Sequence, residues 1–238
     1  MCKDIDYTDK NNKKPSWLLK LEELYENCPQ HDIEYTIKTY NKVTKLDIHK
    51  FYKIIDIISS GSMGQVYMLE DKINKDQVAM KILHPEIDNH LVYFEYLWVL
   101  LSNIFKHKKI MKYVNQIDID HFIYEFKLQS NFCNEGNNIL KFQDIYKNNK
   151  YIIIPKPIYI SKEILLMEYV KGEAYETIDM SRYHRYKLML QYYLFIRNNS
   201  IIYDFNHGDL HKGNWKVKKI GDIYKLVIYD FGLCFRLG

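Results

Sequence analysis

The fold of this chain is decided by residues 59–85, which read SSGSMGQVYMLEDKINKDQVAMKILHP. Two runs within this stretch, residues 65–69 and 77–83, are rich in the apolar residues that favour strands. An earlier run at residues 54–58 has the same character. Glycines separate residues 54–58 from residues 65–69, and mostly polar residues separate residues 65–69 from residues 77–83. This pattern predicts a three-stranded antiparallel meander.

The turn between the first two predicted strands fits a phosphate-binding loop. Ser59 to Val66 match the pattern G-x-G-x-x-G-x-V, with Ser59 in place of the first glycine. Gly61 and Gly64 matter because a chain without β-carbons can fold tightly over phosphates and offer its N–H groups. Taken alone the match is weak, and a plain hairpin turn is the better interpretation. The candidate nucleotide-binding residues of this turn are Ser59, Gly61, Ser62, Gly64 and Val66.

Lys81 follows on the next predicted strand, in the segment Val78-Ala79-Met80-Lys81. A lysine one hairpin after a glycine-rich loop is placed to pair with the α- and β-phosphates of a nucleotide. A single lysine is usually a solvated surface charge. A lysine that closes an otherwise apolar strand at this distance from the loop is less easily explained in that way.

Two further segments complete a kinase-like set. His207 to Asn214 match H-x-D-L-x-x-x-N, in which Asp209 accepts the proton of the attacking hydroxyl and Asn214 binds a metal ion. Asp230 begins the segment Asp-Phe-Gly, and its carboxylate would hold Mg²⁺ between the β- and γ-phosphates. The four segments occur in the order that a kinase requires. They predict ATP and Mg²⁺ as cofactors, Asp209 as the catalytic base, and Asn214 with Asp230 as the metal ligands.

The same region allows a different reading as a metal-dependent hydrolase. His207, Asp209 and His211 alternate, so on a strand they would share one face and could bind a metal ion. Such a site needs a third or fourth ligand, and the remaining histidines are scattered without pairing. The kinase interpretation is therefore preferred.

The rest of the chain adds helices and a few strands. Apolar residues at helical spacing predict two short helices within residues 16–40 and longer helices over residues 90–105, 120–142 and 183–197. Short apolar runs predict strands at residues 151–154, 164–169 and 226–228. The end of the 164–169 run also suits a kinase hinge, in which backbone groups of Glu168 to Val170 would hydrogen-bond the adenine edge.

A sheet followed by helices predicts an α+β, bilobal protein kinase-like fold. The N-lobe would hold the antiparallel sheet with a helical insert, and the C-lobe would be helical and incomplete. We expect three parts: a helical leader at residues 1–50, the N-lobe at 51–170, and a partial C-lobe with the catalytic and metal-binding loops at 171–238.

Composition excludes several other classes of protein. The chain has 238 residues, of which 47% are hydrophobic and 27% charged, as in an ordinary globular protein. No apolar run reaches the ~18 residues of a spanning helix, and the first residues do not form a secretory signal. The net charge of +4 is spread over the chain, so no nucleic-acid partner is expected. Four distant cysteines indicate reduced thiols and an intracellular, cytoplasmic location.

One helix suggests a further partner. Residues 90–105 carry Phe94, Trp98 and Phe105 on an apolar face and are followed by several lysines between 106 and 112. That pattern is suited to peripheral contact with an anionic membrane, although burial against the rest of the fold is the favoured alternative.

These residues together resemble the UbiB family of atypical protein kinase-like proteins, which is linked to ubiquinone biosynthesis. The likeness is carried by GSMGQVY at residues 61–67 and by VAMKILHP at residues 78–85. It extends to the leader, with Cys28-Pro29, and to a helical insert between residues 91 and 138, so that residues 16–238 are covered. The resemblance implies a kinase-like fold and an ATP-binding phosphotransferase or ATPase whose acceptor is unknown.

The chain departs from the family pattern in its acidic residues. The family's Lys-x-Gly-Gln motif is absent, which places autoinhibition of that kind in doubt, and its Glu-x-Asp becomes Glu125-Phe126-Lys127. The position at which the resemblance implies the glutamate that pairs with Lys81 is Asn131. Glu135, one helical turn further on, and Glu125 are the two candidates for that carboxylate.

The chain also stops at Gly238, soon after Asp230, whereas the family continues through several more helices. We therefore expect a truncated gene product, a fragment or a degenerate member, in which Leu210, Trp215, Val227 and Phe231 expose apolar surface. Two alternatives to an active kinase remain: a catalytically inactive pseudokinase scaffold, and a small-molecule kinase of the aminoglycoside or choline type.

Overall fold

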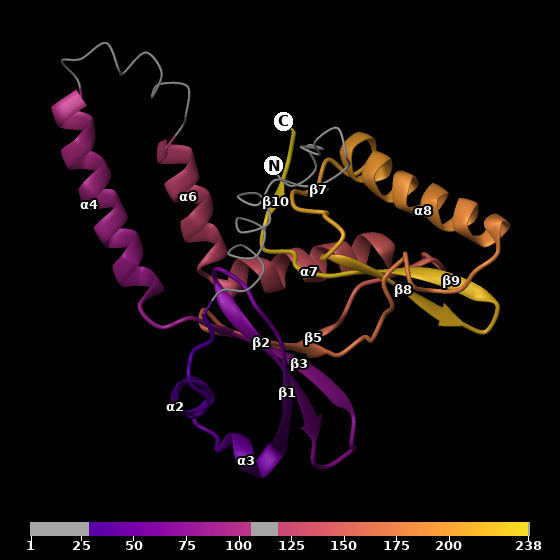
Figure 1. Ribbon diagram of the computed structural model, residues 1–238, viewed down its shortest axis with the longest axis horizontal. Coiled ribbons are helices and arrows are strands. Elements are labelled where there is room, and N and C mark those ends of the chain that lie inside the picture. The colour runs from indigo at the N-terminus through magenta and orange to yellow at the C-terminus, as the bar shows by residue number, and fades with distance from the viewer. Residues whose placement is uncertain (1–28, 106–118, 238) are drawn as a thin grey trace, which may run out of the picture.

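The chain has the expected α+β fold, which is built around an antiparallel sheet of five strands (Figure 1). The computed structural model describes residues 29–105 and 119–237. The strands of the main sheet lie in the order β1-β2-β3-β6-β5. Their bounds are Tyr52–Ser60 for β1, Gly64–Asp71 for β2, Gln77–Leu83 for β3, Pro157–Ile160 for β5 and Ile164–Glu168 for β6.

The first three strands confirm the predicted meander. β2 pairs with β1 and β3 on its two sides, and Lys81 of β3 lies opposite Val66 of β2 and Leu165 of β6. β5 is not among the predicted strands, because Pro155 and Pro157 interrupt the sequence there and proline usually ends a strand. Proline is tolerated in β5 because this strand forms the edge of the sheet, with β6 as its single sheet neighbour.

One helix of the leader packs on the outer face of this sheet. α2, Ile33–Thr44, begins at Asp32, whose side chain caps it by accepting a hydrogen bond from the Glu34 N–H. The short helix α3, Ile48–Phe51, leads into β1. Tyr40 and Ile48 pack against apolar residues of the sheet in a core of their own. α2 confirms the second predicted leader helix, whereas the first, within residues 16–25, lies outside the described residues.

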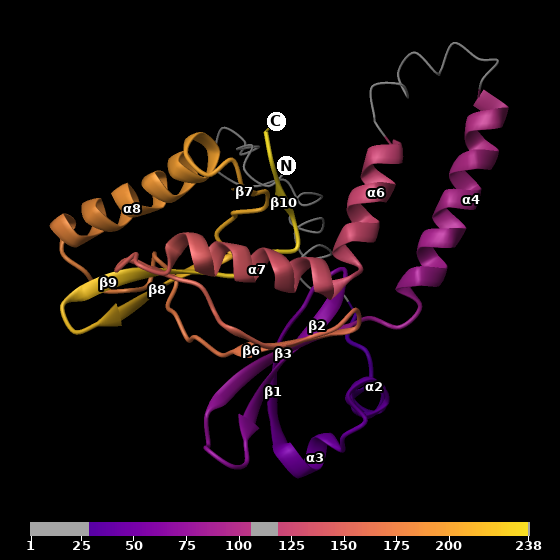
Figure 2. The same ribbon diagram turned by 180° about the vertical axis from the view of Figure 1, so that it is seen from behind.

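The helical insert projects from the body of the molecule as a pair of helices (Figure 2). α4, Ile87–Phe105, confirms the helix predicted at residues 90–105, and α6, Ile119–Gln129, lies beside it. Glu95 of α4 and Lys127 of α6 form an ion pair. The expectation of one helix over residues 120–142 is wrong. The chain turns after α6, and Asn131 starts a new helix, α7, Phe132–Tyr146, by accepting a hydrogen bond from the Cys133 N–H.

The second half of the chain forms a smaller sheet and one long helix. The small sheet has the order β4-β9-β8, with β4 at Ile152–Ile153, β8 at Trp215–Ile220 and β9 at Ile223–Ile228. The helix α8, Arg182–Ile201, confirms the prediction at residues 183–197. Two short strands, β7 at Asn206–His207 and β10 at Cys234–Phe235, pair antiparallel. The division of the chain at Val170 stays a prediction.

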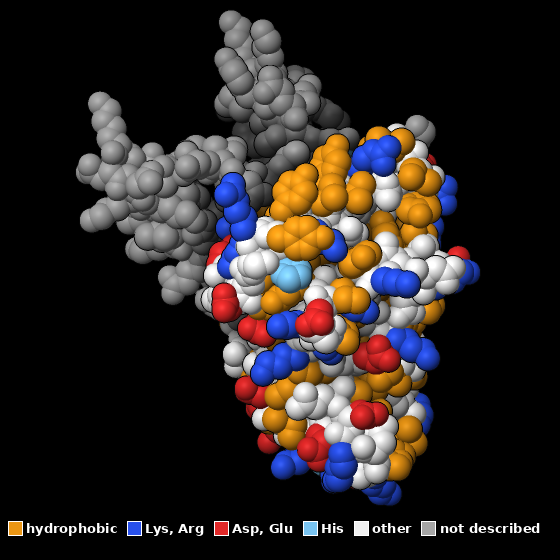
Figure 3. Space-filling model, turned by 90° about the vertical axis from the view of Figure 1, so that its right-hand side faces the viewer, with side chains coloured by type: hydrophobic (Ala, Val, Ile, Leu, Met, Phe, Trp, Pro, Cys, Tyr) orange, Lys and Arg blue, Asp and Glu red, His pale blue; other side chains and the backbone are white. Residues whose placement is uncertain are grey.

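The expected exposure of apolar side chains near the catalytic loop is wrong. Trp215, Val227 and Phe231 are buried. Trp215 and Phe231 belong to a core to which α7 and α8 contribute, and the partly buried Leu210 packs against that core. Exposed apolar side chains instead gather on the face that includes α8 (Figure 3). The exposed residues of α8 include Tyr183, Tyr186, Leu190, Tyr193 and Ile196. Within the described residues, no helix is long and apolar enough to cross a membrane.

Substitution by alanine should affect the stability of the protein differently at the two glycines of the β1–β2 turn. A β-carbon on Gly64 would lie 2.3 Å from the Ile82 carbonyl oxygen, whereas one on Gly61 would meet nothing closer than 3.9 Å. We expect Gly64→Ala to lower the free energy of unfolding in urea by about 2–3 kcal/mol, because backbone atoms of β2 and β3 must separate. Gly61→Ala is the control and should stay within about 0.5 kcal/mol of the original protein. Equal effects of the two substitutions would contradict this close approach.

Candidate functional site

A nearly buried ion pair between β3 and α7 forms the centre of the candidate site. The Nζ atom of Lys81 lies 2.8 Å from Oε2 of Glu135, and the two side chains are 12% and 4% exposed. Glu135 is therefore the carboxylate that pairs with Lys81. Glu125 is not: its carboxylate lies 3.8 Å from the ring of His121, one turn earlier on α6.

Local features of α7 explain how Glu135 reaches the sheet. The cap at Asn131 starts the helix, so that Glu135 falls in its first turn. The next residue, Gly136, packs so closely on β5 that a β-carbon would lie 2.6 Å from the Ile160 side chain. The Lys81 ammonium also lies 5.1 Å from the centre of the Phe132 ring, which adds a cation–π contact. The interruption between α6 and α7 thus places the carboxylate of Glu135 beside the buried ammonium group of Lys81.

Asp230 brings a second carboxylate to the same lysine. Its Oδ1 lies 3.5 Å from Lys81 Nζ and accepts a hydrogen bond from the Gly232 N–H, while half of the Asp230 side chain stays exposed. The residue has φ +53°, a left-handed conformation that non-glycine residues rarely adopt. Asn138 of α7 holds the next residue by donating a hydrogen bond to the Phe231 carbonyl. Asp230 is therefore turned toward Lys81 by a strained backbone that α7 supports.

The three charges shift one another's pKa. Burial opposes the charge of Lys81, but the carboxylates of Asp230 and Glu135 outweigh it and raise the pKa of the lysine. The charge of Lys81 lowers the pKa of Asp230. Burial raises the pKa of Glu135, against the attraction of the same lysine. Near neutral pH the half-exposed carboxylate of Asp230 is charged and can face a ligand.

The predicted catalytic loop lies between β7 and β8. The Asn214 amide nitrogen donates hydrogen bonds to the backbone oxygen of Asp209 at 2.8 Å and to its Oδ2 at 3.3 Å. The Asp209 side chain is 48% exposed, so its carboxylate can reach a substrate. Among the described residues, none donates a hydrogen bond to the Asn214 amide oxygen, which leaves that atom available to a cation.

His207 joins this loop to Asp230. Its Nε2 lies 3.0 Å from the Tyr229 carbonyl, and its Nδ1 accepts a hydrogen bond from the Asp209 N–H at 3.3 Å. A carbonyl can only accept, so Nε2 carries the hydrogen, and burial lowers the pKa of the ring and keeps it neutral. The ring also packs edge-on against the ring of Phe231, with 5.1 Å between the two ring centres. His207 thus positions both carboxylates through the backbone.

The alternative reading of this loop as a hydrolytic metal site is wrong. Both ring nitrogens of His207 are occupied by backbone groups, and Nδ1 of His211 accepts a hydrogen bond from the Gly213 N–H. Within the part of the chain that the structure describes, no group of three or more metal-binding side chains lies together. The hydrogen bonds of His207 and His211 to backbone groups therefore stabilise the conformation of the loop.

The glycine-rich segment forms the β1–β2 turn above β3. Ser59 pairs with Val66 across the two strands, and the turn is closed by a hydrogen bond from the Gly61 N–H to the Gly64 carbonyl at 3.0 Å. Ser62 is exposed at its tip. The segment is thus a hairpin turn, and its position beside Lys81 is compatible with a phosphate-binding loop as well.

The predicted hinge has one free backbone donor. The Glu168 N–H is bonded to the Lys156 carbonyl, and the Val170 carbonyl accepts a hydrogen bond from the Tyr229 hydroxyl at 2.6 Å. The Val170 N–H donates to no residue that the structure describes. Of the backbone groups expected at the adenine edge, the N–H of Val170 thus remains available, whereas that of Glu168 does not.

Sequence reasoning missed Asn138 and Tyr229, whose side chains form hydrogen bonds to the backbone of Phe231 and of Val170. Asn138 follows Glu135 by three residues on one face of α7, a spacing that could have singled it out. Tyr229 directly precedes Asp230, but nothing in the sequence relates it to Val170, because that contact spans 59 residues.

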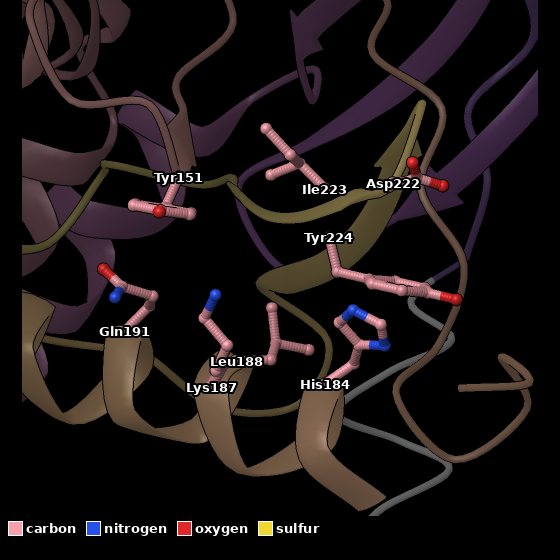
Figure 4. A pocket seen from close by; sticks show the side chains of 8 residues that line it. All are labelled: Tyr151, His184, Lys187, Leu188, Gln191, Asp222, Ile223 and Tyr224. Carbon is pink, nitrogen blue, oxygen red and sulfur yellow. The ribbon is translucent and has the colours of Figure 1, made fainter. Parts of the chain in front are cut away.

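None of these residues lines the surface pocket that Figure 4 shows. It is found between α8 and the β8–β9 hairpin, and its lining includes His184, Lys187, Asp222 and Tyr224. It contains neither a glycine-rich turn nor the paired carboxylates. The candidate site is therefore the group of residues around Lys81 and not this pocket.

Comparison with known proteins agrees with this geometry. Residues 23–238 match a family described as the ABC1 atypical kinase-like domain. A relative from Dictyostelium discoideum, named "Probable serine/threonine-protein kinase abkC", is 26% identical over 213 residues, which cover 85% of this chain and 30% of the relative. The chain thus spans about a third of the length of that protein.

Solved structures show the same fold. Rv3197 from Mycobacterium tuberculosis, solved in complex with erythromycin, superposes with a TM-score of 0.66 at 16% identity, over 93% of this chain and 56% of that one. The Rio2 kinase from Chaetomium thermophilum, in an ADP/Mg²⁺-phosphoaspartate complex, has a TM-score of 0.50 at 14% identity, over 86% and 53% of the two chains. At these identities the likeness establishes the kinase-like fold alone.

The two candidate glutamates can be separated by their effect on stability. Glu135→Ala should lower the free energy of unfolding in urea by about 3 kcal/mol, because it leaves the buried ammonium of Lys81 with the half-exposed Asp230 as its remaining partner. Glu125→Ala, the matched control, removes a partly exposed carboxylate and should stay within about 0.5 kcal/mol. A larger loss from Glu125→Ala than from Glu135→Ala would contradict the assignment.

Proposed function

Because the chain belongs to the ABC1 family of atypical kinase-like domains, we propose that it binds Mg²⁺-ATP and acts as a phosphotransferase or ATPase. The family assignment confirms the resemblance to UbiB proteins, and relatives are named as kinases. The observation that carries the proposal is the convergence of Glu135 and Asp230 on the buried head of Lys81. A lysine held in this way has a fixed ammonium beside the glycine-rich turn.

The proposed roles follow from what each group can still bind. Lys81 would pair with phosphate oxygens, and backbone N–H groups between Gly61 and Gly64 would face the same phosphates. The free N–H of Val170 would donate to the adenine edge. Glu135 is nearly buried and keeps the lysine in place, so it would not contact the nucleotide.

The residues present fit a magnesium ion. Mg²⁺ prefers oxygen ligands and uses one or two carboxylates together with phosphate oxygens. Asp230 offers a half-exposed carboxylate, and Asn214 offers an amide oxygen whose nitrogen is already bonded to Asp209. A bound Mg²⁺ would neutralise charge on the phosphates. Asp209, exposed and oriented by Asn214, would accept the proton of the attacking hydroxyl.

Two alternatives to this proposal differ in a measurable way. A pseudokinase scaffold would bind the nucleotide without turning it over, and the departures in the acidic motif favour that reading. A small-molecule kinase would turn over ATP with a soluble alcohol or amine acceptor. Measured turnover with and without added acceptors separates the two from each other and from an ATPase.

Nucleotide titration tests the site directly. Lys81→Ala and Asp230→Ala should each weaken the binding of Mg²⁺-ADP about tenfold or more, because each removes a charge-assisted contact worth about 1.5–3 kcal/mol. Asp209→Ala should leave binding within about twofold and abolish any turnover of Mg²⁺-ATP. Isothermal titration calorimetry gives the affinities, and circular dichroism checks that each variant is folded. Unchanged affinity in both of the first two variants would contradict the proposal.

A second proposal concerns the helical insert. Of the predicted apolar face, Trp98 is half-buried, and the side chains of Phe94 and Phe105 lie outside the described ones. Val92, Tyr93, Tyr96 and Leu97 of α4 are exposed. α4 and α6 project from the body, which leaves this surface accessible (Figure 2). We propose that α4 lies on an anionic membrane surface. The lysines predicted to assist, between residues 106 and 112, lie outside the described residues.

Vesicle co-sedimentation tests this contact. Tyr93→Glu should reduce binding to phosphatidylserine-containing vesicles about threefold or more, because a carboxylate replaces an apolar side chain at the lipid boundary. Tyr186→Glu, the same substitution at an exposed tyrosine of α8, is the control and should have no effect. Binding that responds to neither anionic lipid nor salt would count against the membrane proposal.

A further inference from the structure

His84 forms hydrogen bonds to the backbone of the glycine-rich turn. It directly follows β3, and its ring Nε2 lies 2.9 Å from the carbonyl oxygen of Gly61. Its backbone N–H donates a second hydrogen bond to the Met63 carbonyl at 3.0 Å. One residue thus contacts two carbonyl groups of the turn that is proposed to cover the phosphates.

His31 connects His84 to the segment that precedes the sheet. The Nδ1 atoms of the two rings lie 2.8 Å apart, and the rings meet edge to face. Nε2 of His31 lies 2.8 Å from the hydroxyl of Thr36, a fully buried residue of α2. The backbone N–H of His31 also donates to Oε1 of Gln65, which directly follows the turn.

The hydrogen positions on the two rings are determined by the Gly61 carbonyl. A carbonyl oxygen can only accept, so Nε2 of His84 carries a hydrogen. In a neutral ring the other nitrogen is then an acceptor, and Nδ1 of His31 must donate to it. A continuous path of hydrogen bonds therefore runs from α2 through Thr36, His31 and His84 to the turn.

Both rings are neutral near pH 7, as this path requires. Burial, then the neighbouring His84, lowers the pKa of His31 to about 4, and Asp32 opposes the shift only weakly. Burial also lowers the pKa of His84, against its bond to Gly61. The hydroxyls of Ser60 and Tyr67 and the Gln65 amide also face the pair, and none of them carries a charge near pH 7. The Tyr35 ring packs edge to face against His31.

We propose that His84 is a positioning residue for nucleotide binding and that His31 makes the nucleotide affinity depend on the docking of α2. The turn can bind phosphates only if its N–H groups point at them, and His84 fixes the carbonyls that alternate with those groups. Coupling is reciprocal, so a bound nucleotide must in turn stabilise the docked position of α2. This inference rests on the proposed function of the site.

Four variants of the two histidines test the path. His84→Ala should weaken Mg²⁺-ADP binding about tenfold, and His84→Gln should recover most of that loss, because a glutamine amide can still donate to the Gly61 carbonyl. His31→Ala should weaken binding about threefold. The double variant should bind no more weakly than His84→Ala, because His31 acts through His84. His49→Ala, at an exposed histidine of α3, is the control.

Hydrogen exchange supplies a readout that a merely structural role would not change. In the original protein, saturating Mg²⁺-ADP should slow amide exchange within residues 33–44, whereas in His31→Ala the nucleotide should leave that exchange unchanged. Equal protection in both proteins would overturn the coupling. So would variants that lose thermal stability while they keep the original nucleotide affinity.

The outcomes also separate this inference from the proposed function. If the original protein fails to bind Mg²⁺-ADP, the proposed function fails, and this inference fails with it. If the original protein binds, and His84→Ala and His31→Ala bind equally well, the nucleotide site stands and the role of the histidine pair is overturned.

Discussion

The buried ammonium of Lys81 sets a constraint on the rest of the structure. Its neighbours along β3, Met80 and Ile82, are fully buried, so the charge lies in an apolar sheet and needs a carboxylate within reach. The helix α7, which crosses this face of the sheet, supplies the carboxylate of Glu135. The cap at Asn131 and the close approach at Gly136 let α7 do so. The insert formed by α4 and α6 ends at Gln129, just before this cap.

The same helix organises the second half of the chain. Asn138 holds the backbone of Phe231, and the ring of Phe231 packs between Phe142 and His207. His207 in turn contacts the backbone on both sides of the site, at Asp209 and Tyr229. An apolar cluster with one neutral histidine thus positions two charged groups that belong to different loops. The small sheet and α8 bury this cluster, which is why the apolar side chains near the catalytic loop are covered.

The glycine-rich turn is supported from a different direction. Its backbone is bonded to His84 after β3, and the segment before the sheet reaches the same region through His31 and Gln65. Gln65 and His84, which belong to the two stretches that carry the resemblance to UbiB proteins, both take part in this contact. They have a structural explanation as partners of the leader segment. Lys81 and the turn are consequently held by separate sets of contacts, one from α7 and one from α2.

The sequence by itself determined the meander, the α+β class and the four segments that meet at the candidate site, because strand periodicity, glycine positions and motif spacing are local properties. The alternation of apolar and charged residues over Trp215-Lys-Val-Lys could also have predicted the start of β8. Only the tertiary structure decided which glutamate pairs with Lys81. Glu125 and Glu135 lie ten residues apart, and the periodic pattern predicted that both belong to a single helix. The new helix that starts at Asn131 turns Glu135 toward the sheet, whereas Glu125 stays on the insert. Periodicity identifies the apolar face of a helix, but it does not determine which distant residue that face will meet. The contacts between Tyr229 and Val170 and between His31 and His84 depend on the packing of whole elements, so no local signal could reveal them.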